Sequence, residues 1–137
     1  MKQRIIILLA ILFGYSASAQ NTDYNVVFDI TSSDTMAHKT VMRQVKGITT
    51  ERPDAKLEVV VYGGAIDLVL KDKSKFVSAI EDLTKNNKAS IKVCAGTMKR
   101  NNIRPDQLVA GVEIVPDGIY EIILKQQEGW GYIKVAH

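Results

Sequence analysis

The sequence predicts an α/β fold, in which a mostly parallel, five-stranded sheet lies between two layers of helices. Five short runs rich in β-branched and aromatic residues recur along the chain, and segments with apolar residues at helical spacing separate most of them. Strands that are nearly continuous apolar runs are typical of parallel sheets covered on both faces, with right-handed crossover connections. We therefore expect one three-layer α/β/α domain.

The first half of the chain predicts two strands around one helix. The run YNVVFDI indicates a strand over residues 24–30, and LEVVVY indicates a second over residues 57–62, which a pair of glycines ends. Between them, the capping sequence Ser-Ser-Asp at 32–34 opens a segment with apolar side chains at helical spacing. This pattern predicts an amphipathic helix that ends before Pro53.

The second half continues the alternation. A short apolar turn over residues 68–70 precedes a helix that begins near Phe76 and ends at Asn86. A last helix opens at the Pro-Asp-Gly sequence 116–118 and ends at Gly129, and its isoleucines 119, 122 and 123 are expected to share one face. The remaining strands are expected over residues 90–94, 112–115 and 132–135.

The first 19 residues indicate a signal peptide. Lys2 and Arg4 precede an apolar run over residues 5–13, and the Ala-Ser-Ala triplet at 17–19 is typical of a cleavage site. The apolar run is shorter than the roughly 20 residues that a membrane-spanning helix needs. We expect a mature domain over residues 20–137 that is periplasmic or secreted, and an uncleaved N-terminal anchor is the alternative.

The charge balance argues against two classes of partner. The chain has 18 basic and 15 acidic side chains, and loss of Lys2 and Arg4 with the signal peptide leaves 16 against 15. Nucleic acids and anionic membranes bind to basic patches. The alternating lysines 71, 73 and 75 are the one short candidate, and we interpret them as solvated, with an anion-binding patch as the alternative. We expect no nucleic-acid partner and no membrane association after cleavage.

The single cysteine, Cys94, is the main candidate for chemistry. Ligands of open parallel sheets collect where strands end, which here points to the loops after the first four strands, and Cys94 ends the third. The small residues 95–97 allow a tight turn that directs backbone amides toward the sulfur, and cations follow at 99 and 100. Such surroundings lower a thiol pKa and suit a nucleophilic or persulfide-bearing cysteine. A small buried hydrophobe is the alternative, and no internal disulfide can form.

Other motifs offer weaker candidates. Gly63 and Gly64 allow the backbone to approach a ligand or the Cys94 loop, but they belong to no phosphate-binding motif. His38 and His137 have no metal-ligand spacing with Cys94, so no metal is expected. A Cys-His pair would require His38 to reach across, and the solvated side of its helix is its expected place. Three aromatic residues near the chain end are expected in the core or at an oligomer interface, with stacking on a ligand as the alternative, and they are Tyr120, Trp130 and Tyr132.

These residues together resemble the DsrE/DsrF-like family, the small sulfur-relay proteins of the DsrE, DsrF, DsrH and Tus type. The resemblance covers most of the mature chain. The block Val-Cys-Ala-Gly-Thr-Met at 93–98 and the glutamine-rich ending at 124–133 are its most specific parts. The opening strand, the strand and turn at 57–64 and the Val-Pro-Asp-Gly turn at 115–118 also belong to it.

The resemblance implies a five-stranded α/β/α fold and a tendency to assemble into trimers or hexamers. We expect no cofactor. The resemblance also implies that Cys94 matches the residue that accepts sulfane sulfur as a persulfide and hands it on, with a sulfur donor or acceptor protein as a partner. Gly63, Gly64, Gly96 and Thr97 are then expected to shape its pocket. Export sets this chain apart from relays of the reducing cytoplasm, so transfer-RNA thiolation is not expected.

A second hypothesis comes from a different class. The chain has no second cysteine and no convincing acid-base partner for Cys94. A non-catalytic oligomeric module, with a structural cysteine and a strand-end pocket for a small ligand, is therefore the alternative to sulfur transfer. The sequence leaves open whether the protein is an enzyme.

Overall fold

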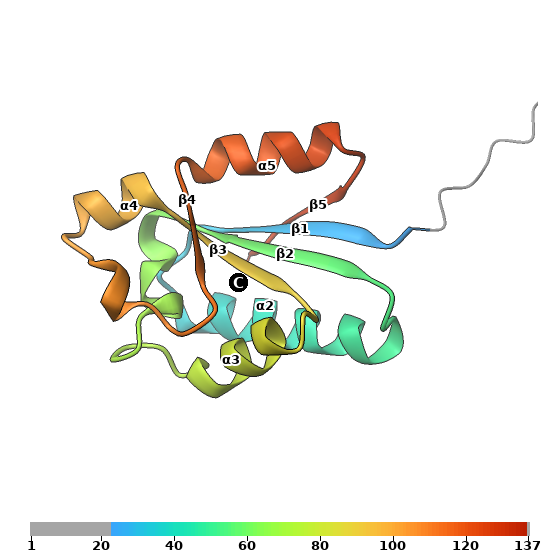
Figure 1. Ribbon diagram of the computed structural model, residues 1–137, viewed down its shortest axis with the longest axis horizontal. Coiled ribbons are helices and arrows are strands. Elements are labelled where there is room, and N and C mark those ends of the chain that lie inside the picture. Colours follow the sequence, from blue (N-terminus) through green and yellow to red (C-terminus); the bar gives the residue numbers. More distant parts are fainter. Residues whose placement is uncertain (1–22, 137) are drawn as a thin grey trace, which may run out of the picture.

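The computed structural model describes residues 23–136, in which a single five-stranded sheet separates two layers of helices (Figure 1). The predicted signal peptide and His137 lie outside the described residues. The strands are β1 (Asn25–Ile30), β2 (Lys56–Val61), β3 (Ser90–Cys94), β4 (Glu113–Val115) and β5 (Gly131–Lys134). Their order across the sheet is β4-β3-β2-β1-β5, and every neighbouring pair is parallel. The predicted α/β class and five-stranded sheet are confirmed.

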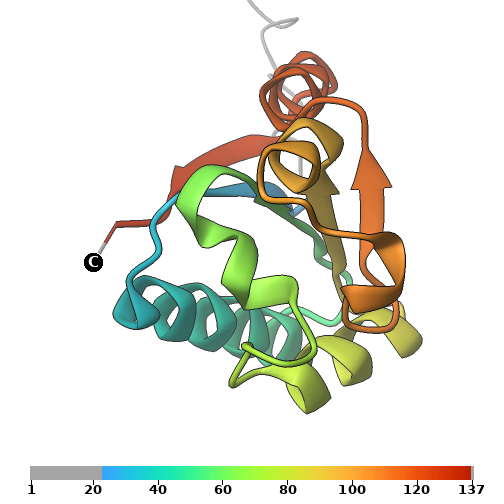
Figure 2. The ribbon, with the colours of Figure 1, turned by 90° about the vertical axis from the view of Figure 1, so that its left-hand side faces the viewer.

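The helices divide unequally between the two faces of the sheet. Two of them, α2 (Thr35–Glu51) and α3 (Val77–Lys85), cover one face, and α5 (Gly118–Gln127) lies on the other. In Figure 2 the sheet again lies between α5 and the layer of α2 and α3, and the 3-10 helix η2 (Gly63–Val69) lies on the α2 side. The short helix α4 (Ala95–Arg100) and the 3-10 turn η3 (Pro105–Gln107) follow β3.

The main apolar core lies between the sheet and the α2 and α3 layer. Alternate residues of the strands point into it, because successive side chains of a strand face opposite sides. Helix α2 begins at the N-cap Asp34, whose side chain accepts a hydrogen bond from the amide of Met36 at 2.8 Å. Fully buried members of this core include Phe28, Ile30, Val41, Val45, Val59, Val61, Ile80 and Ile91.

The face under α5 is smaller and more polar. Its apolar cluster of buried residues consists of Val27, Val60 and Ile122. Of the three isoleucines expected to share one face of this helix, Ile122 is buried, whereas Ile119 and Ile123 are 56% and 44% exposed. The physical reason is that the strands below α5 carry charged side chains, so the helix is rotated to bring its own charged residues toward them.

His38 is also not where the sequence analysis expected it. Its side chain is buried rather than solvated, with 5% exposed, and its ring Nε2 lies 2.9 Å from the carbonyl oxygen of Ser32. This contact satisfies a backbone group of the loop that enters α2. His38 therefore has a local structural partner on the α2 side of the sheet.

Within residues 23–136, no helix has the length and apolar character needed to span a bilayer.

Candidate functional site

Cys94 lies at the carboxyl edge of the sheet, where β3 passes directly into α4. It is the last residue of β3, its Cα partner in β4 is Val115, and the next residue begins α4. The residue is 7% exposed. The cysteine thus lies at the sheet edge where parallel folds place their ligands, and it is nearly covered.

The surroundings of the Cys94 sulfur are polar on the side where the chain turns. Burial acts to raise the pKa of the thiol, but hydrogen bonds from the backbone amides of Gly118, Thr97 and Gly96 and from the Thr97 side chain outweigh it. The pKa therefore lies below its ordinary value. Hydrogen bonds to the charged form favour that form. The arrangement is suited to holding a thiolate.

Thr97 connects the cysteine loop to the end of β2. Its side chain is fully buried, and its Oγ1 accepts a hydrogen bond from the backbone N–H of Gly63 at 3.1 Å. Gly63 has a φ of +59°, a conformation that glycine adopts without the steric penalty of a side chain. Arg100 donates from Nη2 to the same Oγ1 at 3.2 Å.

Two glycines leave room beside the cysteine. A Cβ on Gly96 would lie 3.6 Å from the Cys94 sulfur and 3.5 Å from Nη1 of Arg100, so one atom at this position would contact both groups. A Cβ on Gly118 would lie only 3.3 Å from the Cβ of Cys94. Gly118 begins α5, so this helix packs closely on the cysteine.

The structure brings together four of the five predicted site residues. Gly96 and Thr97 direct backbone amides to the Cys94 sulfur, and Gly63 is joined to them through its hydrogen bond to Thr97. Gly64 does not: a Cβ there would lie 3.1 Å from the carbonyl oxygen of Thr31 and 3.3 Å from the amide of Ser33. Gly64 allows a close approach between η2 and the loop after β1, away from the sulfur.

The site also contains two residues that the sequence analysis did not select as site residues. Gly118 lies in the loop after the fourth strand, a place that sheet topology singles out, but only the fold shows that its amide faces Cys94. Arg100 was noted as a nearby cation, while its contact with Thr97 needs the geometry of α4. Among residues 23–136, no group of three or more potential ligands could hold a metal ion.

A buried charge cluster lies under α5, further back along β2 and β3. Nζ of Lys92 lies 3.6 Å from carboxylate oxygens of both Glu58 and Glu121 and 3.7 Å from one of Glu113. Oε2 of Glu58 also accepts a hydrogen bond from Ser90 at 3.1 Å, while Oε1 is buried without a partner. Burial and the Glu121 side chain, opposed by the charge of Lys92, raise the pKa of Glu58 to about 7. The Glu58 carboxyl therefore holds its proton to a higher pH than an ordinary glutamate does.

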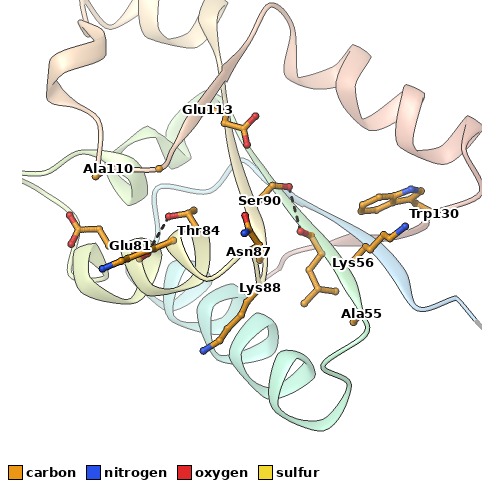
Figure 3. A pocket seen from close by; sticks show the side chains of 14 residues that line it. Ala55, Lys56, Glu81, Thr84, Asn87, Lys88, Ser90, Ala110, Glu113 and Trp130 are labelled. Carbon is orange, nitrogen blue, oxygen red and sulfur yellow. Dashed lines mark hydrogen bonds between the residues drawn. The ribbon is translucent and has the colours of Figure 1, made fainter.

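A pocket of about 710 Å³ lies at the opposite, amino edge of the sheet (Figure 3). Ala55, Lys56, Ser90 and Glu113 line it at the strand starts, with Trp130 on one side. Residues of the Cys94 site do not line this pocket. It is therefore separate from the thiol chemistry.

Comparison with known proteins agrees with this fold and with the earlier resemblance. The model of the DsrE/DsrF-like family matches residues 9–135. The chain belongs to the DsrE/DsrF-like family. A comparison with curated proteins found no significant match.

Solved structures of the same fold come from other organisms. A protein of unknown function from Methanobacterium thermoautotrophicum, MTH1491, is 28% identical, covers 82% of this chain and 99% of its own, and superposes with a TM-score of 0.76. The ychN protein from E. coli is 15% identical over 82% of this chain and 99% of its own, with a TM-score of 0.69. BT1422 from Bacteroides thetaiotaomicron, of unknown function, is 12% identical over 85% and 99%, with a TM-score of 0.65. The last two likenesses concern the fold alone.

Proposed function

We propose that this DsrE/DsrF-like protein binds and transfers sulfane sulfur through Cys94. The observation that carries the proposal is the convergence of the Gly96, Thr97 and Gly118 amides on one sulfur, which lowers its pKa. The thiolate is the form of cysteine that attacks sulfur, and its fraction at neutral pH rises as the pKa falls. Family membership supports a sulfur-relay role in general.

The reaction conserves atoms and electrons without a redox cofactor. The Cys94 thiolate attacks the outer sulfur of a donor such as thiosulfate, an S–S bond forms to Cys94, and the donor S–S bond breaks. The leaving sulfite takes that electron pair. An acceptor thiolate then attacks the outer sulfur of the Cys94 persulfide and releases the Cys94 thiolate. The same amides that hold the first thiolate accommodate the negative charge of the persulfide.

The space beside the sulfur supports a small donor. An atom in the place left by Gly96 would contact both the sulfur of Cys94 and the guanidinium of Arg100, since each lies within 3.6 Å of the Cβ position. Because Cys94 is only 7% exposed, a small inorganic donor reaches the sulfur more readily than a bulky thiol compound.

The burial of Cys94 also favours the alternative, a non-catalytic module in which the cysteine is structural. Free cysteines are among the most buried residue types and often serve as small hydrophobes. The two functions differ in one measurable property. A structural cysteine reacts only after unfolding, whereas a sulfur carrier reacts in the native protein.

We also propose that the protein is exported and self-assembles. The basic and apolar pattern of residues 1–19 supports periplasmic or secreted localisation. Apolar side chains exposed on α5 and on the edge strand β4 support contacts between copies, and they are Ile114, Ile119 and Ile123. Native mass spectrometry of the mature chain tests the expected trimer or hexamer.

Intact-mass measurement tests the sulfur-transfer proposal. The reduced native protein is incubated with thiosulfate or polysulfide and weighed, and a gain of about 32 Da, the mass of one sulfur atom, is expected. The gain should be reversed by dithiothreitol and absent from Cys94→Ser, which removes the single cysteine. An adduct that forms only in urea-unfolded protein would contradict the proposal and support the structural cysteine.

A further inference from the structure

We propose that Arg100 is a positioning residue for Cys94: its guanidinium holds the Thr97 hydroxyl so that the hydroxyl proton is directed toward the Cys94 sulfur. This role rests on the proposed function of Cys94, and it identifies the residue that helps to keep the Cys94 thiol ionised. Arg100 is not itself placed on the reacting atoms.

The hydrogen-bonding capacity of the Thr97 hydroxyl limits where its proton can point. A hydroxyl has one proton to donate and two lone pairs that accept. Both accepting positions of Thr97 Oγ1 are occupied, by the N–H of Gly63 at 3.1 Å and by Nη2 of Arg100 at 3.2 Å. The remaining direction around Oγ1 belongs to its proton.

Burial makes this orientation consequential. Thr97 is fully buried, so water does not compete for its hydroxyl. A buried polar group without a partner is unfavourable, and the Cys94 sulfur is the neighbour whose ionised form the Thr97 side chain stabilises. Because other groups donate to both of its accepting positions, the hydroxyl is left to donate its own proton to the thiolate.

The geometry of Arg100 suits this task better than that of a lysine would. A guanidinium is planar and presents several N–H groups in a fixed arrangement, whereas an ammonium is a mobile point charge. Nη2 contacts Thr97 while Nη1 of the same group lies 3.5 Å from the Cβ position of Gly96, so the fork spans the cysteine loop. Asn101 supports the same turn by donating to the Thr97 carbonyl oxygen at 2.8 Å.

A cation near a thiolate also acts by direct charge attraction, and the two mechanisms are separable. Direct attraction at an exposed cation weakens as salt rises, because ions screen it over about 10 Å at 0.1 M. A hydrogen-bond relay through a buried hydroxyl depends little on salt. It also requires Thr97, whereas direct attraction does not.

The test measures the pH dependence of Cys94 alkylation in the full chain by intact mass, in Arg100→Met, Thr97→Val and the double variant. Arg100→Met is expected to raise the apparent thiol pKa and to slow alkylation at pH 7 by about threefold, the effect of losing part of one hydrogen bond. Lys99→Met removes the same charge from the neighbouring residue and serves as the matched control, with no change expected.

The double variant decides between the mechanisms. If Arg100 acts through Thr97, then Arg100→Met has no further effect once Thr97→Val is present, and its effect alone persists in 0.5 M salt. Additive effects, or an Arg100→Met effect that disappears in salt, would overturn the proposal. If Thr97→Val fails to fold, Thr97→Ser keeps the hydroxyl, and its retention of the Arg100 dependence is then required.

The outcome is independent of the persulfide experiment. Alkylation reports the state of the thiol whether or not the protein carries sulfur. If the wild type gains no sulfur but Arg100→Met still slows alkylation of Cys94, only the proposed function is contradicted. A chain that gains sulfur while Arg100→Met leaves the alkylation profile unchanged contradicts this inference alone.

Discussion

The backbone amide of Gly118 faces the sulfur of Cys94, and it does so from the first residue of α5. A Cβ on Gly118 would approach the Cβ of Cys94 to 3.3 Å, which is closer than side chains normally pack. The seating of α5 on the sheet and the ionisation of the thiol therefore depend on the same contact.

Gly118→Ala is expected to destabilise the protein and to raise the pKa of Cys94. The added methyl would also meet Val60 at 3.3 Å and Tyr62 at 3.4 Å, so α5 must shift and its amide moves away from the sulfur. Overpacking of this kind costs about 1 kcal/mol or more. Urea denaturation measures the loss, and alkylation as a function of pH measures the thiol.

Gly47→Ala is the matched control for this substitution. Gly47 lies within α2, and a Cβ there would meet no atom within 4 Å. Replacing a helical glycine by alanine stabilises by about 0.5–1 kcal/mol. If Gly118→Ala were as stable as Gly47→Ala and the pKa of Cys94 were unchanged, the space between Gly118 and Cys94 would have to accommodate a methyl group. That result would contradict the prediction.

Gly96→Ala is expected to reduce sulfur loading without loss of stability. Its new Cβ would lie at ordinary contact distances from Arg100 and the Cys94 sulfur, and alanine is a better helix former than glycine in α4. The methyl would occupy the space beside the sulfur that is proposed above for an atom of the donor. Persulfide formation, followed by intact mass over time, should fall about tenfold or more, the effect of about 1.4 kcal/mol on the barrier. Unchanged loading in a stable variant would contradict that placement.

The strands and the parallel class followed from local patterns, whereas their order did not. Runs such as YNVVFDI indicate a strand because β-branched side chains suit a pleated surface. They carry no information on which strand pairs with which, so the central position of β2 and the placement of β5 beside β1 come only from the structure. The helix α4 was likewise treated as a tight turn, because its six residues are too few for a periodic pattern.

The exposure of two isoleucines on α5 has a single cause. Ile119 and Ile123 matched a helical apolar face, but α5 packs on strands that carry Glu58 and Lys92. Those two charged residues stood inside runs expected to be apolar on both faces, and they were a signal that one face is polar. At the site, Cys94 and Thr97 could be predicted because they lie at the carboxyl end of a strand. The contact of Gly118 with Cys94 could not be predicted, because it forms only when two loops that are distant in sequence meet in the fold.

Tyr132→Phe is expected to loosen the edge strand β5. The Tyr132 hydroxyl donates to the buried Asp29 carboxylate at 2.6 Å, and this contact raises the pKa of Tyr132 to about 12. Every side chain of β5 is exposed, so polar ties to β1 matter more than apolar packing. Loss of one hydrogen bond to a charged group lowers the free energy of unfolding by about 1–2 kcal/mol.

Hydrogen exchange locates this effect. The backbone amides of β5 should exchange faster in Tyr132→Phe, while those of β3 remain protected. Tyr120→Phe is the control, because its ring lies on α5 and is 60% exposed. Equal stability losses in the two variants would show that the hydroxyl contact with Asp29 contributes nothing specific.

The protein is expected to lose stability toward unfolding as pH rises through neutrality, because of the buried Glu58 carboxyl under α5. Glu58 has a pKa raised from 4.5 to about 7 in the folded protein, chiefly by burial and then by Glu121. Between these two values the folded state binds more protons than the unfolded state, so the free energy of unfolding decreases as pH increases. The contribution is fully present below pH 4.5 and is lost through about pH 7, with a size of roughly 1–3 kcal/mol.

Glu58→Gln isolates this contribution. A glutamine mimics the protonated acid, since its carbonyl oxygen accepts from Ser90 and its amide donates toward Glu121. The variant should therefore match the wild type near pH 5 and exceed its stability at pH 8, as measured by urea denaturation across this range. Glu113→Gln removes a carboxylate that contacts the same Lys92 but is 62% exposed, and it should keep the wild-type pH dependence. If the stability of Glu58→Gln instead fell with pH as steeply as that of the wild type, Glu58 could not be the group that titrates. Only a group that loses its proton between pH 5 and pH 8 can make the stability difference between the two proteins depend on pH.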